Sequence, residues 1–279
     1  MSPRSDDDPV ARRSDRLYGF FEGVMRRQLA GQFRAVRLAR PGLPDLPPDR
    51  PVMVYTNHPS WWDPAVFIAL HPRFFPGRAA FGPIDAAMLE RYRFMARIGL
   101  FGVEPDSPRG AAAFLRQAMR VTDAPDRVLW ITAQGRFTDV RVRPLALRPG
   151  AAHLMARRAG LVALPMALDY TFWSEKRPEA LLAFGAPVEA APGEEAALLA
   201  PRLEGALTDA ADDLTAHAMA RDPAGFEMLI GGRRGTGGVY GLWQRARAAA
   251  AGRDWSPDHA PDHAPDGAPE PDRAPEEER

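Results

Sequence analysis

Apolar residues recur along this chain in two patterns, and the alternation of the two predicts an α/β fold. Short, nearly continuous apolar runs are typical of buried strands. They occupy residues 51–55, 127–132, 161–168 and 181–184. Elsewhere the apolar residues recur at steps of three and four, which is the helical pattern. These helical segments are residues 65–70, 84–98, 110–121, 194–221 and 239–251. Strands that alternate with helices predict a mixed or mainly parallel sheet flanked by helices.

A longer helical pattern precedes the first strand, over residues 14–40. Its apolar positions are Leu17, Phe20, Phe21, Val24, Met25, Leu29, Phe33 and Val36. The arginines that surround this stripe are Arg12, Arg13, Arg16, Arg26, Arg27, Arg34, Arg37 and Arg40. An N-terminal basic amphipathic helix of this kind can lie in a lipid interface. It can also pack on the core of its own domain with a solvated polar face, and the pattern alone favours this second arrangement.

The two ends of the chain have the composition of disordered segments. Residues 1–13 are polar, and residues 252–279 are rich in Asp, Pro and Ala with a net acidic charge. Segments with so few apolar residues cannot offset the entropy cost of folding. We therefore expect two disordered tails and one folded domain over residues 14–251.

Composition removes several classes of function. The sequence has no cysteine, which excludes disulfides, thiol nucleophiles and cysteine metal sites. The formal net charge is zero, so no bulk charge draws the chain to nucleic acid, and we expect no nucleic-acid partner. No apolar run reaches the roughly 18 residues of a transmembrane helix. The N-terminus also has no apolar core of the signal-peptide kind, so a cytoplasmic protein is the expectation.

One short turn carries the candidate chemistry, residues 57–63, which read Asn-His-Pro-Ser-Trp-Trp-Asp. It follows the first buried strand and precedes a helix, for which Asp63 is the predicted N-cap and Pro64 the first helical residue. A histidine with a carboxylate five residues on can act as a general base with its orienting partner. Alone, a His–Asp pair is more often structural than catalytic.

The same turn resembles the signature block of the glycerolipid acyltransferases, the family of 1-acylglycerol-3-phosphate acyltransferases. That block reads Asn-His-x-Ser-x-x-Asp, and Asn57, His58, Ser60 and Asp63 all fall in register. The resemblance covers about residues 50–190. It implies that residues 14–251 are an acyltransferase domain with its catalytic core in that stretch.

A second block of the family resembles the stretch that begins at Gly99, and Phe101 and Val103 also fit. Pro105 stands where the family has an arginine that helps to hold the phosphate of the acceptor. Arg109 is a candidate replacement, because an arginine at a helix N-terminus is a ready anion site. A solvated residue in the first turn of the helix is an equal alternative for Arg109.

The third block of the family, Phe-Pro-Glu-Gly-Thr-Arg, is matched strictly only at Gly135. Gln134 replaces the Glu, which keeps an acceptor oxygen but loses the charge. Arg136 replaces the Thr, and Phe137 replaces the Arg. Further on, Arg148 stands in the position of a family lysine and is a candidate for neutralising a phosphate.

The resemblance implies direct acyl transfer. A lipid hydroxyl attacks the carbonyl of an acyl thioester, carried by coenzyme A or acyl-carrier protein, and passes its proton to His58, whose tautomer Asp63 fixes. The implied acceptor is a lysophospholipid such as 1-acylglycerol-3-phosphate, and no metal or resident cofactor is implied. The candidates for substrate binding are Asn57, Ser60, Arg109, Gln134, Gly135, Arg136 and Arg148.

The resemblance also favours a membrane-surface role for residues 14–40, because a lipid substrate has to be reached. It implies a protein of phospholipid biosynthesis, peripheral on the inner face of the cell membrane. Three alternatives stay open. The first is the same chemistry on an acceptor without glycerol phosphate, such as a lyso-amino-lipid or a glycosylated isoprenoid. The second is a thioesterase or lipid hydrolase. The sequence has no Gly-x-Ser-x-Gly elbow, which argues against a serine hydrolase of the α/β type but not against the other hydrolases. The third is an inactive membrane-surface module.

Overall fold

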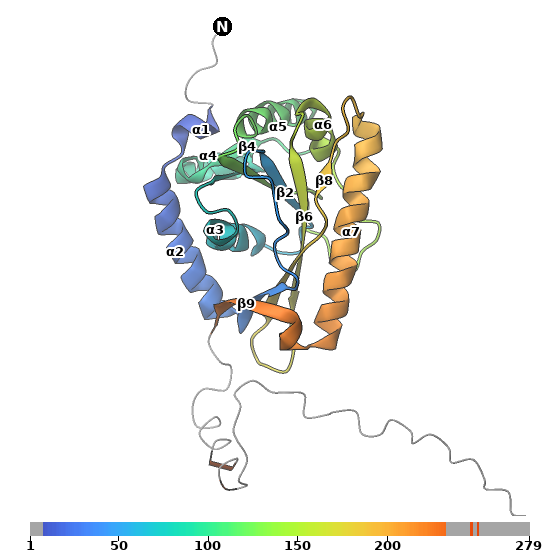
Figure 1. The fold of residues 1–279 in the computed structure, drawn as a ribbon. Helices are drawn as coiled ribbons and strands as arrows, with labels where there is room; N and C mark the ends of the chain where they lie inside the picture. The colour runs from blue at the N-terminus through green and yellow to red at the C-terminus, as the bar shows by residue number, and fades with distance from the viewer. Residues whose placement is uncertain (1–7, 233–245, 248–249, 251–279) are drawn as a thin grey trace, which may run out of the picture.

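A computed structural model gives the structure of residues 8–232, 246, 247 and 250 (Figure 1). Its helices are α1 (Pro9–Arg12), α2 (Asp15–Gln32), α3 (Asp63–Phe74), α4 (Ala86–Arg91), η2 (Arg93–Ile98), α5 (Pro108–Val121), α6 (Gly150–Arg157), α7 (Ala196–Ala220) and η3 (Pro223–Gly225). Its strands are β1 (Ala35–Ala39), β2 (Val52–Thr56), β3 (Ala79–Asp85), β4 (Leu100–Val103), β5 (Arg127–Thr132), β6 (Val162–Thr171), β7 (Glu179–Phe184), β8 (Val188–Glu189) and β9 (Phe226–Gly231).

The described strands form one nine-stranded sheet, which is mixed and mainly parallel, as the sequence predicts for its type. Across the sheet the order is β4-β3-β5-β2-β6-β7-β1-β9, and β8 pairs with the beginning of β6. Five of the pairings among the described residues are parallel and three are antiparallel. β2 lies in the middle, between its parallel neighbours β5 and β6. The carboxyl end of β2 is therefore flanked by two other carboxyl ends, which is where open α/β sheets form their sites.

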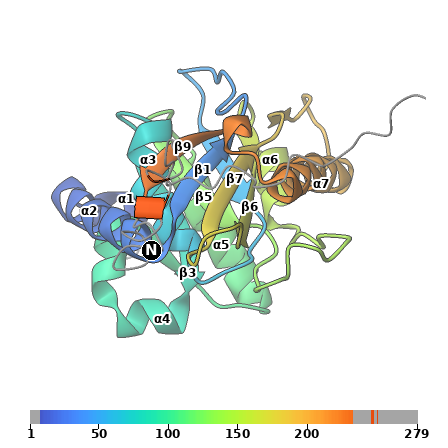
Figure 2. The ribbon, with the colours of Figure 1, turned by 90° about the horizontal axis from the view of Figure 1, so that it is seen from below.

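Helices cover both faces of the sheet, and the side chains of β2 show how the two faces are divided. Val52 and Val54 belong to the apolar cluster that includes residues of α2 and α3, whereas Met53 and Tyr55 belong to the cluster that includes residues of α5, α6 and α7. This alternation is the two-residue period of a strand that is buried on both faces. Figures 1 and 2 both show α2 and α7 on opposite sides of the sheet.

The N-terminal region differs from its prediction in two ways. The helix predicted over residues 14–40 ends at Gln32, and residues 35–39 form β1 instead. Phe33 and Val36 extend the helical stripe, but they also suit a buried strand, so periodicity could not find this boundary. Residues 8–13, predicted to be part of a disordered tail, contain α1, whose N-cap Asp8 accepts a hydrogen bond from the Val10 amide at 3.0 Å. Residues 1–7 lie outside the described residues.

The apolar stripe of α2 packs largely on the domain itself. Leu29 is buried in the cluster shared with α3, and Leu17, Phe21 and Met25 pack against that cluster. Phe20 is different, since it is 64% exposed. None of the helices in the described part of the chain combines the length and the apolar composition needed to cross a bilayer.

Three other predicted helix boundaries are wrong. The helix predicted over residues 84–98 is the end of β3, then α4, then η2, because Asp85 caps a new helix by accepting hydrogen bonds from the amides of Ala87 and Met88. α3 continues through Pro72 to Phe74, four residues beyond the end predicted for the helical segment over residues 65–70. At its start, Trp62 is the N-cap and Asp63 is the first helical residue, one position from the prediction.

The C-terminal predictions are tested only in part. β9 was not predicted, and it pairs antiparallel with β1 at the end of the sheet. Most of the helix predicted over residues 239–251, and the whole tail predicted over residues 252–279, lie outside the described residues.

Candidate active site

The turn after β2 is fastened to the neighbouring strand by a buried asparagine. The Asn57 amide donates to the Leu168 carbonyl at 2.9 Å, and the Leu168 N–H donates to Asn57 Oδ1 at 2.8 Å. Both polar atoms of this side chain are therefore engaged by the main chain of β6. Asn57, a candidate for substrate binding in the sequence, therefore holds the turn with its side chain.

His58 and Asp63 form the hydrogen-bonded pair that the sequence predicts. His58 Nδ1 lies 2.6 Å from Asp63 Oδ2, and we assign the proton to Nδ1, which donates to the carboxylate. Asp63 is fully buried, whereas the His58 side chain is 16% exposed. Within the described part of the chain no hydrogen bond engages His58 Nε2, so the outward nitrogen of the ring is available to accept a proton.

The Asp63 carboxylate has three donors around it. His58 and the Ser60 N–H donate to Oδ2, the latter at 3.3 Å, and the Tyr170 hydroxyl donates to Oδ1 at 2.7 Å. Burial raises the pKa of Asp63, and the hydrogen bonds from His58 and Tyr170 counteract that rise by favouring the charged form. The carboxylate is thus oriented from both of its oxygens. Ser60 also caps the turn, since its Oγ accepts from the Trp62 N–H at 3.2 Å.

Tyr170 is the member of this site that sequence reasoning missed. Burial, together with the negative charge of Asp63, raises the pKa of Tyr170 well above its usual range, so the hydroxyl stays a donor. A signal for it does exist in the sequence. Leu164, Met166 and Leu168 of β6 share one face of the sheet, and Tyr170 is the next residue on that face, at the carboxyl end of the strand beside β2.

Gln134 is buried and holds the main chain of the histidine. Its Oε1 accepts from the His58 N–H at 2.8 Å, and its amide donates to the Leu145 carbonyl at 2.8 Å. The Thr138 N–H adds a bond to the His58 carbonyl at 3.0 Å. Gln134, predicted to bind substrate, therefore positions His58, and it does so with a donor that a glutamate would lack.

Phe137 lies beside the imidazole. The two ring centroids are 4.4 Å apart at an angle of 38°, and Phe137 is 61% exposed. Trp61, three residues after His58 in the same turn, is also exposed. The histidine therefore lies next to exposed aromatic surface, at the position where the resembling block has an arginine.

The predicted anion-binding residues are only partly gathered here. Gly135 has φ of +62°, and a Cβ on it would come to 2.2 Å from Arg148 Nε, so the glycine makes room for that arginine. Arg148 in turn pairs with Asp106 at 2.7 Å, which joins the loop after β5 to the loop after β4. Arg136 is exposed next to Phe137. Arg109 is exposed in the first turn of α5, and within the described part of the chain no hydrogen bond or ion pair joins it to His58.

Comparison with known proteins gives a structural likeness only. No family model and no curated protein matches this sequence. The fold is similar to that of the 1-acyl-sn-glycerophosphate (LPA) acyltransferase PlsC from Thermotoga maritima, with a TM-score of 0.51 and 15% sequence identity over 77% of this chain and 84% of that chain. At this identity the likeness establishes a shared α/β fold.

Proposed function

We propose that this protein is an acyltransferase that moves a fatty acyl group from an acyl thioester to the hydroxyl of a lysophospholipid such as 1-acylglycerol-3-phosphate. The observation that carries the proposal is the His58–Asp63 pair at 2.6 Å, with its outer nitrogen open, at the carboxyl end of the central strand. The likeness to PlsC supports a glycerolipid acyltransferase in general.

The proposed reaction uses His58 first as a base and then as an acid. The acceptor oxygen attacks the thioester carbonyl carbon while His58 Nε2 takes the hydroxyl proton. Asp63 stabilises the imidazolium that forms, as the carboxylate of a catalytic triad does. When the tetrahedral intermediate collapses, the C–S bond breaks and the thiolate leaves with the proton that His58 held. The products are an ester and a free thiol, and no resident cofactor takes part.

The surroundings of the pair suit a lipid substrate. Phe137 and Trp61 give the rim of His58 an exposed apolar surface, and Arg136 next to Phe137 gives it a cationic group. We propose that this rim, with Phe20 and the exposed arginines of residues 14–40, meets an anionic membrane surface. This arrangement fits a cytoplasmic protein that is peripheral on the inner face of the membrane.

The test is a product assay with the purified protein. Labelled acyl-CoA and acyl-carrier protein are offered with lysophosphatidic acid and with a mixed lipid extract. We expect labelled phosphatidic acid from the wild type and a loss of about 10²- to 10⁴-fold in His58→Ala, the usual contribution of a general base. His153→Ala, which removes an exposed histidine on α6, is the matched control and should keep its activity. Transfer that is undiminished in His58→Ala would refute the mechanism.

A second candidate differs only in the acceptor, and Phe137 favours it. An aromatic ring beside His58, in place of the arginine of the resembling block, suits a lipid without the glycerol phosphate head. In the same assay, a product that depends on His58 and appears in another lipid of the extract selects this candidate. Free fatty acid that depends on His58 would indicate the hydrolase instead.

A further inference from the structure

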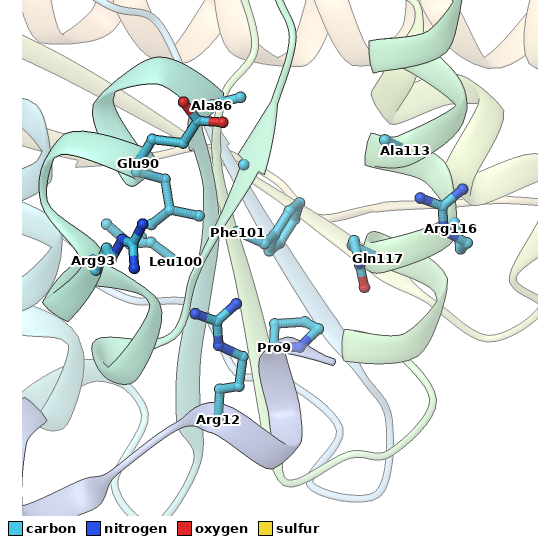
Figure 3. A pocket seen from close by; sticks show the side chains of 12 residues that line it. Pro9, Arg12, Ala86, Glu90, Arg93, Leu100, Phe101, Ala113, Arg116 and Gln117 are labelled. Carbon is cyan, nitrogen blue, oxygen red and sulfur yellow. The ribbon is translucent and has the colours of Figure 1, made fainter. Parts of the chain in front are cut away.

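A second concave site lies at the open edge of the sheet, away from His58. A pocket of about 520 Å³ is walled by α1 below, by α4 and η2 on one side and by α5 on the other (Figure 3). Its floor is formed by three consecutive residues of β4, Leu100, Phe101 and Gly102. Successive side chains of a strand point to opposite faces, so three in a row indicate that the pocket lies against the edge of the strand.

This pocket is separate from the candidate active site. β4 is the last strand on its side of the sheet, and β3 and β5 lie between it and β2. Three strand spacings amount to roughly 14 Å. None of the residues that line the pocket belongs to the turn of His58 or to the loop of Gln134.

The charged groups of the pocket are mostly cationic. Arg12 and Arg93 lie on one side and Arg116 on the opposite side, on α5, while Glu90 is the one acidic residue of the lining (Figure 3). Arg93 and Arg116 make no ion pair or side-chain hydrogen bond to the residues that the structure describes. The guanidinium groups of Arg93 and Arg116 are therefore available to an anionic group from two sides of the pocket.

The rest of the lining is apolar. Phe101 is buried, and its ring stands between Arg93 and Arg116 (Figure 3). Leu89 and Leu100 also line the pocket. A free inorganic anion would leave this surface without a partner. A volume of about 520 Å³ is also within the range of sites that take a whole small molecule.

We propose that this pocket binds a phosphate monoester that carries a short alkyl chain. The monoester has close to two negative charges at pH 7, and arginine forks match phosphate oxygens with paired hydrogen bonds. The alkyl chain covers Phe101, Leu89 and Leu100. A bound ligand contacts α1, η2 and α5 together, so it ties the N-terminal segment to the sheet edge.

The test is calorimetric titration of the whole protein with octyl phosphate, below its micelle concentration, with inorganic phosphate and with octanoate. We expect octyl phosphate to bind at least tenfold more tightly than either of the other two. Arg93→Gln and Arg116→Gln should each weaken it by about tenfold, the loss of one charge-assisted contact. Arg97→Gln is the matched control, because it removes an exposed charge of η2 outside the pocket lining and should change affinity less than twofold.

Hydrogen exchange then locates the bound ligand. Octyl phosphate should slow exchange in residues 86–93 and 113–117. If inorganic phosphate binds as tightly as octyl phosphate, the alkyl chain contributes nothing to binding and that part of the proposal is wrong. If octanoate binds as tightly as octyl phosphate, the pocket does not select a phosphate group. Equal losses in Arg97→Gln and Arg93→Gln, or protection confined to residues 57–63 and 134–138, would overturn the site. None of these measurements depends on acyl transfer, so they test this site independently of the reaction proposed at His58.

Discussion

His71 is a buried histidine whose neutral form the fold requires, and this gives a prediction about stability and pH. It is 1% exposed on α3. Its Nε2–H donates to the Arg78 carbonyl at 2.8 Å, and its Nδ1 accepts from Trp130 Nε1 at 3.0 Å. Nδ1 must therefore be unprotonated. Burial lowers the pKa of His71 to about 4, and nearby Arg13 lowers it further against the effect of the Arg78 bond.

The free energy at stake follows from linkage. A pKa that falls from 6.5 to about 4 on folding corresponds to about 3 kcal/mol. Between these two values the unfolded chain binds a proton that the folded protein excludes, so the free energy of unfolding rises with pH in this window. The stability that His71 contributes at pH 7 is therefore lost as the pH falls from about 6.5 to about 4.

The assay compares urea unfolding of the wild type and His71→Gln at pH 7, 6, 5 and 4.5. Glutamine is close in volume and offers one acceptor and one donor, but it does not titrate. We expect the variant to be less stable at pH 7 by about 1–2 kcal/mol, and the gap to shrink or reverse toward pH 4.5. His153→Gln, exposed on α6, should instead run parallel to the wild type. A constant gap between wild type and His71→Gln at every pH would refute the reasoning.

Three further predictions concern the other buried polar groups. Tyr170→Phe removes one hydrogen-bond donor from Asp63 and so raises the pKa of Asp63 further. We expect kcat for acyl transfer to fall about tenfold and the acid limb of its pH profile to move to higher pH; an unchanged pH profile would contradict this role of Tyr170. Gln134→Glu loses the donor to the Leu145 carbonyl and should cost about 2 kcal/mol in urea unfolding at pH 8, with part regained at pH 5, where the protonated acid can donate again. The buried Arg37 is bonded to Glu179 at 2.9 Å, and Glu179→Gln removes this counter-charge. Thermal unfolding should show a free energy of unfolding lower by about 3–5 kcal/mol, and the double variant Arg37→Met, Glu179→Gln should regain part of it.

The sequence predicted the central part of the fold because its signals there are local. The apolar run before residue 57, the Asp-Pro pair at residues 63–64 and the five-residue spacing of His58 and Asp63 all lie within one strand-turn-helix unit. The long-range contacts of the site were not predictable from local signals, although the family resemblance did name Gln134. Tyr170 lies 107 residues from Asp63 along the chain, and Gln134 lies 76 residues from His58. Only the pairing of β2 with β5 and β6 brings them together.

The strands toward the two ends of the sheet were the other weak point of the prediction. β3 contains Gly82 and Pro83, which are poor strand signals, and its continuation into α4 made residues 84–98 look like one helix. β1 was absorbed into the preceding helix. β9 has exposed and buried residues in an irregular order, so its apolar pattern is weak. In each case the strand is defined by its neighbour in the sheet rather than by its own residues.

The contacts that fix His58 end mostly on main-chain atoms. Asn57 is bonded to the amide and carbonyl of Leu168, and Gln134 to the amide of His58 and the carbonyl of Leu145. A peptide group offers the same hydrogen bonds whatever side chain its residue carries. Positions 145 and 168 therefore accept any apolar residue whose side chain packs in the core. Outside a few short stretches, then, natural selection for this geometry would leave little mark on the sequence. Two chains can keep one fold at 15% identity under constraints of this kind.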